Sequence, residues 1–336
     1  MRIDIHNHAY PPTYLDALRR SGAYEFGKDA DGQEILISRG ARVVTLMPEM
    51  LDLDSRIKTM NRAGVDVQVL SVTAPGVCFT DAGLSRELAR LSNEYLAEAA
   101  KHSSGCYLCM ASVPINHPTI AMEELAYAVD VLKMNAVIVG TNIAGERLDH
   151  PRFRSFFAEV ARRNVPVMLH PMAPWGAEQM ADLGLAPLVG FIFETTLTVS
   201  RMVFAGVFQE IPSLKLILPH TGGAIPFIWE RLNNGWRVYP ESRKKCPELP
   251  ESYLKNLFYD TVSFHIPALR AAYETVGARR LILGTDYPHV IGDMPRAVKN
   301  VQEMGISQSE QEQIYSGNAR GLLANLNLDG AQTDAN

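Results

Sequence analysis

Cysteine is scarce in this sequence. Only Cys78, Cys106, Cys109 and Cys246 occur in 336 residues. So few and so scattered cysteines exclude a disulfide framework and favour a reducing compartment. Cys106 and Cys109 form a C-x-x-C pair, but they fall in an apolar run of strand character, where positions three apart point to opposite faces. A redox or zinc site at this pair is therefore not expected.

Long apolar runs and clusters of basic residues are also missing. No uncharged run reaches the roughly 18 residues that a bilayer span needs, and no basic segment followed by an apolar stretch opens the chain. The net charge is −5 and the basic residues form no long run, which argues against a nucleic-acid surface or a polybasic membrane patch. We therefore expect a cytoplasmic protein with a small-molecule partner, no nucleic acid and no membrane.

What the sequence does contain is a regular alternation of short apolar runs and segments with helical spacing. The apolar runs are nearly unbroken, as strands buried on both faces are; they cover residues 2–8, 66–72, 107–113, 136–140, 165–170, 214–220, 257–262 and 280–286. The expected helices cover residues 52–63, 85–100, 118–132, 149–163, 195–210, 225–236, 266–276 and 308–324. This alternation predicts an α/β fold, a (β/α)8 TIM barrel. An open doubly wound sheet is the alternative, but no G-x-G-x-x-G follows the first strand.

One barrel domain is expected over residues 1–327, followed by a flexible polar tail over 328–336. Residues 9–51 and 171–194 are too long for ordinary loops between a strand and a helix. They follow the carboxyl ends of the first and fifth strands, the end of a TIM barrel at which active sites lie. Both insertions are therefore expected to cover the active site.

Histidine and aspartate stand at the carboxyl ends of several predicted strands. His6 and His8 are two apart on the first strand and so face the same side; His170 closes the fifth strand, His220 the sixth and Asp286 the eighth. Core histidines satisfied by hydrogen bonds would be the simplest explanation, but packing does not explain so many ionisable groups at one end. The pattern predicts a metal site, best suited to zinc, with manganese or iron as alternatives.

Four motifs at these positions resemble those of the amidohydrolase superfamily. They are DIHNH at 4–8, HP at 170–171, HTGGAIPF at 220–227 and ILGTDYP at 282–288. The resemblance extends from residue 2 to about 325, and it is most specific to the branch of 2-amino-3-carboxymuconate-6-semialdehyde decarboxylase, whose members decarboxylate acids such as γ-resorcylate and 5-carboxyvanillate.

The resemblance implies a role for each of these side chains. His6, His8, His170 and Asp286 would bind the metal, and His220 would act as the acid/base. A second metal would require a bridging lysine near the end of the fourth strand, which reads AVIVG. We therefore expect one divalent metal and no organic cofactor.

Two arginines also match the family pattern. Arg42 corresponds to an arginine that binds a substrate carboxylate. Arg231, eleven residues past His220, corresponds to one that the neighbouring subunit contributes, which implies a homodimer. Planar forked donors suit carboxylates, which supports both assignments.

The pocket wall departs from the family pattern. Gly184 and Pro187 stand where the decarboxylase has tryptophans, and His289 replaces a phenylalanine after TDYP. We expect the substrate pocket of this chain to be lined by other residues; His289 and Trp175 are the main candidates, with Met47 and Met172 beside them.

These observations predict a metal-dependent, non-oxidative decarboxylase of a small unsaturated or aromatic acid, an enzyme of aromatic compound catabolism. Arg42 and Arg231 would hold a carboxylate, and His220 or Asp286 would deliver a proton to the carbon that loses CO2. A metal-dependent hydrolase or hydratase is the alternative, in which His220 deprotonates a water and Asp286 passes the proton on. A barrel without catalysis, acting as a scaffold, is disfavoured because all five inferred metal and acid/base positions are filled.

Overall fold

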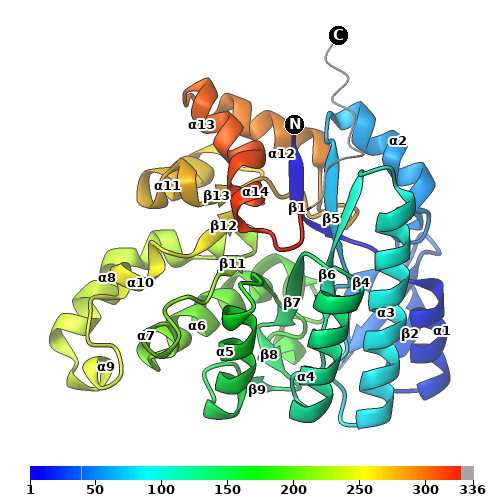
Figure 1. Cartoon of the computed structure of the whole chain (residues 1–336), viewed down its shortest axis with the longest axis horizontal. Coiled ribbons are helices and arrows are strands. Elements are labelled where there is room, and N and C mark those ends of the chain that lie inside the picture. The colour runs from blue at the N-terminus through cyan, green and yellow to red at the C-terminus, as the bar shows by residue number, and fades with distance from the viewer. Residues whose placement is uncertain (39, 327–336) are drawn as a thin grey trace.

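A barrel of parallel strands forms the centre of the computed structural model (Figure 1), which describes residues 1–38 and 40–326. Eight strands of the described chain pair in sequence order: β1 (Ile3–His8), β5 (Val67–Ser71), β6 (Tyr107–Ser112), β7 (Ala136–Gly140), β10 (Val167–His170), β11 (Leu216–Leu218), β12 (Phe258–Asp260) and β13 (Leu281–Ile282). The ring closes where the backbone N–H of Ile5 donates to the carbonyl of Leu283 at 2.8 Å. The predicted barrel is thus confirmed, whereas the predicted tail lies outside the described residues.

The strands form because their apolar residues are buried on both faces. Alternate residues such as Ile3 and Ile5 fill the barrel interior, and residues such as Leu70 and Val137 pack outward against the helices. Each fully buried side chain of this size contributes about 1.5–3 kcal/mol relative to exposure. Two hydrophobic layers, one on each side of the strands, therefore hold the wall.

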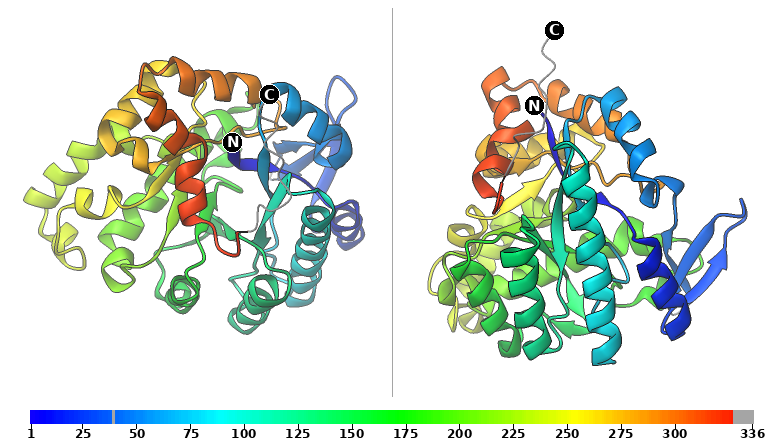
Figure 2. Two further views of the ribbon diagram at one scale, coloured as in Figure 1. Left: turned by 45° about the horizontal axis from the view of Figure 1, so that its top comes forward. Right: turned by 45° about the vertical axis from the view of Figure 1, so that its right-hand side comes forward.

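Helices surround the barrel on its outer side (Figure 2). The longer ones are α2 (Leu53–Ala63), α3 (Ala82–His102), α4 (Pro118–Ala126), α5 (Arg154–Arg162), α6 (Phe191–Phe204), α8 (Ile225–Val238), α11 (Ile266–Val276) and α12 (Met294–Glu303). Shorter elements are α7 (Val207–Glu210), α9 (Pro240–Arg243), α10 (Pro250–Leu254), α13 (Gln308–Glu312) and α14 (Asn318–Leu322), with a small hairpin of β8 (Asn142–Ile143) and β9 (Glu146–Arg147).

Several helical predictions need correction. The helix predicted over 195–210 is two helices, α6 and α7, and α4 ends at Ala126 before a wider helical turn over Tyr127–Val131. Helix α12 was not predicted, although its apolar residues recur at helical spacing and the Asp293 side chain caps its first turn by accepting from the N–H of Arg296 at 2.9 Å. The predicted last helix is interrupted, because the segment Gln313–Gly317 has a wider helical turn between α13 and α14.

The first insertion contains α1 (Pro12–Ser21) and an antiparallel sheet of β2 (Glu25–Lys28), β3 (Glu34–Ser38) and β4 (Ala41–Thr45). This segment, blue in Figure 2, projects beside the barrel. The second insertion contains the helical turns Ala177–Gln179 and Ala186–Gly190, and the latter contacts β4. The two insertions are therefore in contact, as expected if both cover the active site.

The stretch Ala186–Phe204 is long and apolar enough to resemble a membrane span, with a mean hydropathy of 1.2, but half of it is buried in the protein. Its α6 portion packs against α8, α10 and the turn at His220. Its apolar character is that of a helix that packs against other elements of the protein.

Candidate metal and substrate site

The predicted ligands come together at the carboxyl ends of the strands. The Nε2 atoms of His6 and His8 are 3.1 Å apart, and they lie 3.3 and 3.5 Å from Oδ1 of Asp286. The ring of His170 packs 5.2 Å from that of His6 and 4.7 Å from that of His8, measured between ring centroids. All four side chains are buried. Residues separated by up to 280 positions thus face one small volume.

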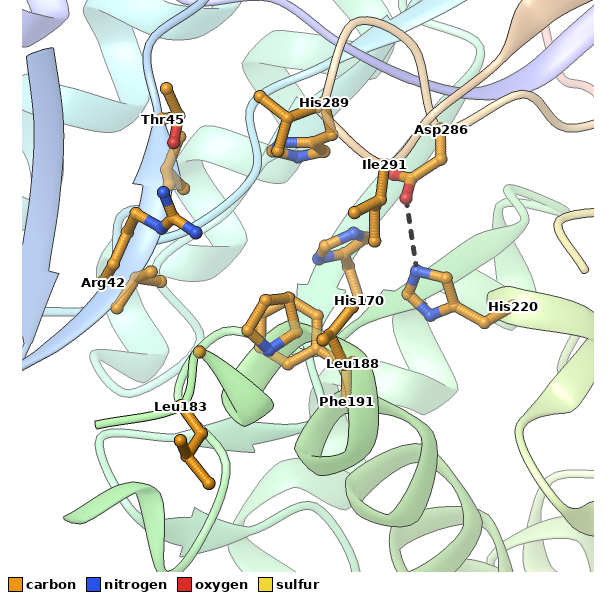
Figure 3. Close-up of a pocket in the computed structure, with 15 residues that line it drawn as sticks. Arg42, Thr45, His170, Leu183, Leu188, Phe191, His220, Asp286, His289 and Ile291 are labelled. Atoms are coloured by element: carbon orange, nitrogen blue, oxygen red, sulfur yellow. Dashed lines mark ion pairs between the residues drawn. The ribbon is translucent and has the colours of Figure 1, made fainter. Parts of the chain in front are cut away.

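His220, which follows β11, also belongs to this cluster. His6, His170, His220 and Asp286 offer donor atoms that lie within 4.8 Å of one another, while His8, Asp286 and His289 form a second such group that shares Asp286. Nε2 of His220 is 3.8 Å from Oδ2 of Asp286. In Figure 3, His220 and His289 lie on different sides of Asp286.

Hydrogen bonds fix which nitrogen of each imidazole faces the cluster. The Ser71 hydroxyl donates to the carbonyl of Asn7 at 2.9 Å, so its oxygen accepts from Nδ1 of His8 at 3.0 Å. Nδ1 of His170 donates to the carbonyl of Pro171 at 2.8 Å. In both rings the Nε2 lone pair is left for the cluster, which is the tautomer that binds a metal.

A buried aspartate that was not predicted from the sequence orients two more groups. Oδ2 of Asp260 lies 2.5 Å from Nδ1 of His6 and accepts from the backbone N–H of His220 at 2.9 Å. Its Oδ1 accepts from the N–H groups of Thr221 and Val262. A signal was present, because this aspartate lies inside the predicted seventh strand, 257–262, where a buried carboxylate requires partners.

Burial and neighbouring charges set the protonation of the cluster. Burial holds the pKa values of His8 and His170 well below the ordinary histidine value, so both rings are neutral at pH 7. Burial alone would raise the pKa of Asp286, but His6, with His220 and His8, holds it well below the usual range. The result is a carboxylate beside imidazole lone pairs.

Three atoms of the cluster are buried without a hydrogen-bond partner among the described residues: Nε2 of His170, Nδ1 of His220 and Oδ1 of Asp286. Such groups are rare because each costs free energy when left unpaired. Neutral imidazole nitrogens and a carboxylate oxygen are ligands of zinc and manganese. The donor set of His6, His8, His170 and Asp286 therefore fits a divalent cation.

The backbone is strained at the two residues that leave the strands here. His220 and Asp286 have φ values of 53° and 58°, and Thr221 has 56°. Non-glycine residues rarely adopt such values, and they cluster at functional sites where the surroundings hold them. Here the Asp260 carboxylate anchors the turn at His220, and the N–H of Asp286 donates to the carbonyl of His6 at 2.8 Å.

A pocket of about 190 Å³ lies over the cluster (Figure 3). Its floor is polar, and its walls are mostly apolar side chains from the two insertions and from the segment after β13. The lining residues are Arg42, Val43, Val44, Thr45, His170, Leu183, Gly184, Pro187, Leu188, Phe191, His220, Asp286, His289, Val290 and Ile291. An apolar cavity with a few convergent polar groups is the usual form of a small-molecule site.

Only some of the predicted substrate-binding residues line this pocket. Arg42 and His289 line the pocket, as do Gly184 and Pro187. The expectation for Trp175 is wrong, because Trp175 lies with Met172 in a separate cavity of about 250 Å³. The Glu194 carboxylate accepts from the backbone N–H of Trp175 at 3.2 Å and fixes it there.

Two further predicted residues lie outside this pocket. Arg231 is exposed on α8 and is not among the described residues that line the pocket. Met47 packs against the hydrophobic core and is absent from the same lining.

Comparisons with known proteins show which family and which solved structures this chain resembles. The amidohydrolase family model matches residues 3–324. A 2-amino-3-carboxymuconate-6-semialdehyde decarboxylase of Dictyostelium discoideum is 27% identical, over 96% of this chain and 91% of that protein. A γ-resorcylate decarboxylase of Rhizobium sp. is 30% identical, over 85% and 90%. The solved structure of a dihydroxybenzoic acid decarboxylase from Polaromonas sp., with bound manganese and the inhibitor 2-nitroresorcinol, is 25% identical, with a TM-score of 0.78 and 96% of each chain covered.

Proposed function

Since the chain belongs to the amidohydrolase family, we propose that it is a metal-dependent decarboxylase of a small aromatic or unsaturated carboxylic acid. The observation that supports this most is the convergence of imidazole Nε2 atoms and the Asp286 carboxylate on the floor of a pocket that also contains Arg42. The similar proteins of known activity are decarboxylases. We expect the protein in the cytoplasm, as the scarcity of cysteine suggests.

His6, His8, His170 and Asp286 would hold one divalent cation. Zinc is our first expectation and manganese the alternative, because imidazole and carboxylate serve both. When bound, the cation supplies electrostatic stabilisation of the negative charge that develops as the carboxylate leaves. No lysine near the end of β7 is available to bridge a second cation.

The side chains of the pocket would bind and orient the acid. Arg42 offers a planar, forked set of donors that matches a carboxylate. Phe191, Leu188 and Ile291 provide an apolar wall for the rest of the molecule. An acid bound against this wall would displace water from it, which strengthens the electrostatic interactions in the pocket.

His220 would supply the proton that replaces CO2. In the reaction the bond between the carboxylate and its carbon breaks, the electron pair stays on that carbon, and the carbon takes up a proton. His220 faces the pocket beside Asp286, with 3.8 Å between Nε2 and Oδ2. Asp286 would then take up a proton from solvent and pass it to His220. Alternatively, Asp286 would itself deliver the proton to the carbon that loses CO2.

A homodimer would complete the site with Arg231 from a second copy. Arg231 is exposed on α8 and does not line the pocket of its own chain. The same helix exposes Phe227, which is 92% accessible. The pocket mouth exposes Leu183, Leu188 and Val290 at 70%, 53% and 59%. Exposed apolar patches of this kind mark interaction sites. Mixing R231A with H220A chains should restore activity in hybrid dimers if each site takes its arginine from the other chain.

The proposed activity is tested with metal-loaded enzyme and a panel of hydroxybenzoates and muconate-type acids. We expect CO2 release without a redox cofactor. Absence of CO2 across the panel would contradict the proposal. Incorporation of ¹⁸O from solvent water into the product would instead support the hydrolase or hydratase alternative, which none of the described comparisons favours.

A further inference from the structure

The separate cavity around Trp175, which we call the aromatic cavity, is larger than the pocket over the cluster. Its volume is about 250 Å³, against about 190 Å³ for the pocket. Its wall includes the rings of Tyr24, Phe79 and Trp175, together with the side chain of Met172. A volume of about 150 Å³ is enough to hold benzene in a protein. A molecule with one aromatic ring therefore fits the aromatic cavity.

The aromatic cavity differs from the pocket in its charge. Arg42, Asp286 and three histidines line the pocket, whereas none of the described residues that line the aromatic cavity is Arg, Lys, His, Asp or Glu. Burial raises the pKa of the Cys78 thiol in this wall to about 11, so the thiol is neutral at pH 7. A carboxylate would lose hydration here without gaining a charged partner. The cavity therefore favours a neutral ligand.

Two buried side chains fix the part of the wall that contains Trp175. The Asn142 amide donates to the carbonyl of Ala173 at 2.9 Å and to Oε1 of Glu194 at 2.8 Å. Its Oδ1 accepts from the N–H of Gly145 at 2.9 Å. Oε2 of Glu194 accepts from the N–H of Trp175 at 3.2 Å. The turn between β8 and β9 is thus tied to the segment after β10.

The part of the wall that contains Phe79 is held in a similar way. The carbonyl of Phe79 accepts from the Asn116 amide at 2.6 Å, and its N–H donates to the Ser85 hydroxyl at 3.0 Å. Nearby in the wall, the carbonyl of Gly76 accepts from the Tyr14 hydroxyl at 2.6 Å. The backbone that carries these rings is therefore fixed before any ligand binds, as in most small-molecule sites.

One segment of the chain contributes to both sites. His170 lines the pocket, and Met172 and Trp175 line the aromatic cavity. Gly140 of β7 pairs with His170, and a Cβ atom at this glycine would lie 3.0 Å from Cγ of Met172. The aromatic cavity therefore lies next to the cluster, at the same end of the barrel.

We propose that the aromatic cavity is a second ligand site, which binds a neutral aromatic molecule through the rings of Trp175, Phe79 and Tyr24. Aromatic rings attract one another in offset-stacked and edge-to-face contacts, and the Met172 thioether adds a sulfur contact. Decarboxylation replaces the carboxylate of an aromatic acid by hydrogen, so its product belongs to this class. That identification of the ligand rests on the proposed function, whereas the neutral site does not.

The first test uses wild-type, metal-loaded protein and two fluorinated probes. 4-Fluorophenol is neutral at pH 7, and 4-fluorobenzoate is an anion of similar size. Fluorine NMR titration gives a dissociation constant for each probe. We expect 4-fluorophenol to bind equally well with and without excess 4-fluorobenzoate. Displacement of the phenol by the benzoate, or no binding of the phenol, would overturn the inference.

The second test locates the phenol with variants. Trp175→Ala should raise the dissociation constant of 4-fluorophenol by about tenfold, because an aromatic contact is lost, and Trp175→Phe should recover part of this. Affinity for 4-fluorobenzoate and metal content should not change. Tyr239→Ala, which removes an exposed ring outside the cavity lining, is the matched control. Equal phenol affinity in Trp175→Ala and Tyr239→Ala would refute the site.

Turnover separates this inference from the proposed function. If no acid releases CO2 while phenol binding still depends on Trp175, the proposed function fails and the neutral site stands. If acids release CO2 while phenol binding does not depend on Trp175, this inference fails and the proposed function stands.

Discussion

Nδ1 of His6 and Oδ2 of Asp260 lie 2.5 Å apart, and both side chains are fully buried. The same carboxylate oxygen accepts from the backbone N–H of His220. One residue of β12 therefore orients a predicted metal ligand on β1 and anchors the predicted acid/base after β11. Such partners behind the ligands fix the ring orientation and make the ligand more basic.

Asp260→Asn should weaken metal binding by about ten- to hundredfold, because the amide cannot support His6 as a carboxylate does. Competition with a chelator measures this affinity. Asp149→Asn is the matched control, since Asp149 is a largely buried aspartate that pairs with Arg201 away from the site. Equal metal affinity in the two variants would contradict the role given to Asp260.

His220→Asn should lower kcat by about 10²- to 10⁴-fold, the usual contribution of a positioned acid/base. The metal should remain bound, because His6, His8, His170 and Asp286 are intact. Steady-state kinetics and metal analysis of the same preparation measure both properties. Activity that survives this substitution would show that another group supplies the proton.

Arg42→Gln should raise KM for the acid by about ten- to hundredfold, because a forked, charged donor to the carboxylate is lost. Arg42→Lys should recover only part of the affinity, since a point charge does not match the planar carboxylate. Arg20→Gln, at an exposed arginine of α1, should leave KM unchanged. If Arg42→Gln and Arg20→Gln have the same KM, the acid does not bind at Arg42.

Arg56 of α2 is fully buried behind β1. Its guanidinium donates to the carbonyl of His8, to Oδ1 of Asn7 and to Oε1 of Gln68 at 2.6–2.8 Å. Burial lowers its pKa to about 10, so it is charged at pH 7.

Arg56→Met should lower the free energy of unfolding by about 3–5 kcal/mol, because it leaves this buried network without its donor. Urea denaturation measures the change. Arg62→Met on the same helix, where the arginine is exposed, should change stability by less than about 0.5 kcal/mol. A similarly small effect at Arg56 would show that the network does not stabilise the fold.

The barrel and the cluster were predictable from the sequence for a physical reason. Strands buried on both faces need unbroken apolar runs, and a histidine or aspartate at the end of such a run stands out. The alternation along β1 also places His6 and His8 on one side without any tertiary information. The family resemblance added the distinct role of His220.

Other features have no comparable local signal. Arg56 lies on a helix whose polar face would normally be exposed, and only its tertiary contacts show that it is buried. The antiparallel sheet β2–β4 has strands of four or five residues, too short for an alternating pattern to be clear. Trp175 was placed in the pocket by its position in the insertion, but it lies in a separate cavity, and its backbone N–H donates to Glu194 of α6, a contact that has no local sequence signal.

We propose above all that His6, His8, His170 and Asp286 bind one divalent cation. Anomalous X-ray scattering from crystals grown with zinc or manganese would locate this cation. We expect a single strong peak per chain on the cluster, about 2.0–2.2 Å from the three Nε2 atoms and from an oxygen of Asp286. A cluster without a peak, or a peak held by other residues, would contradict it.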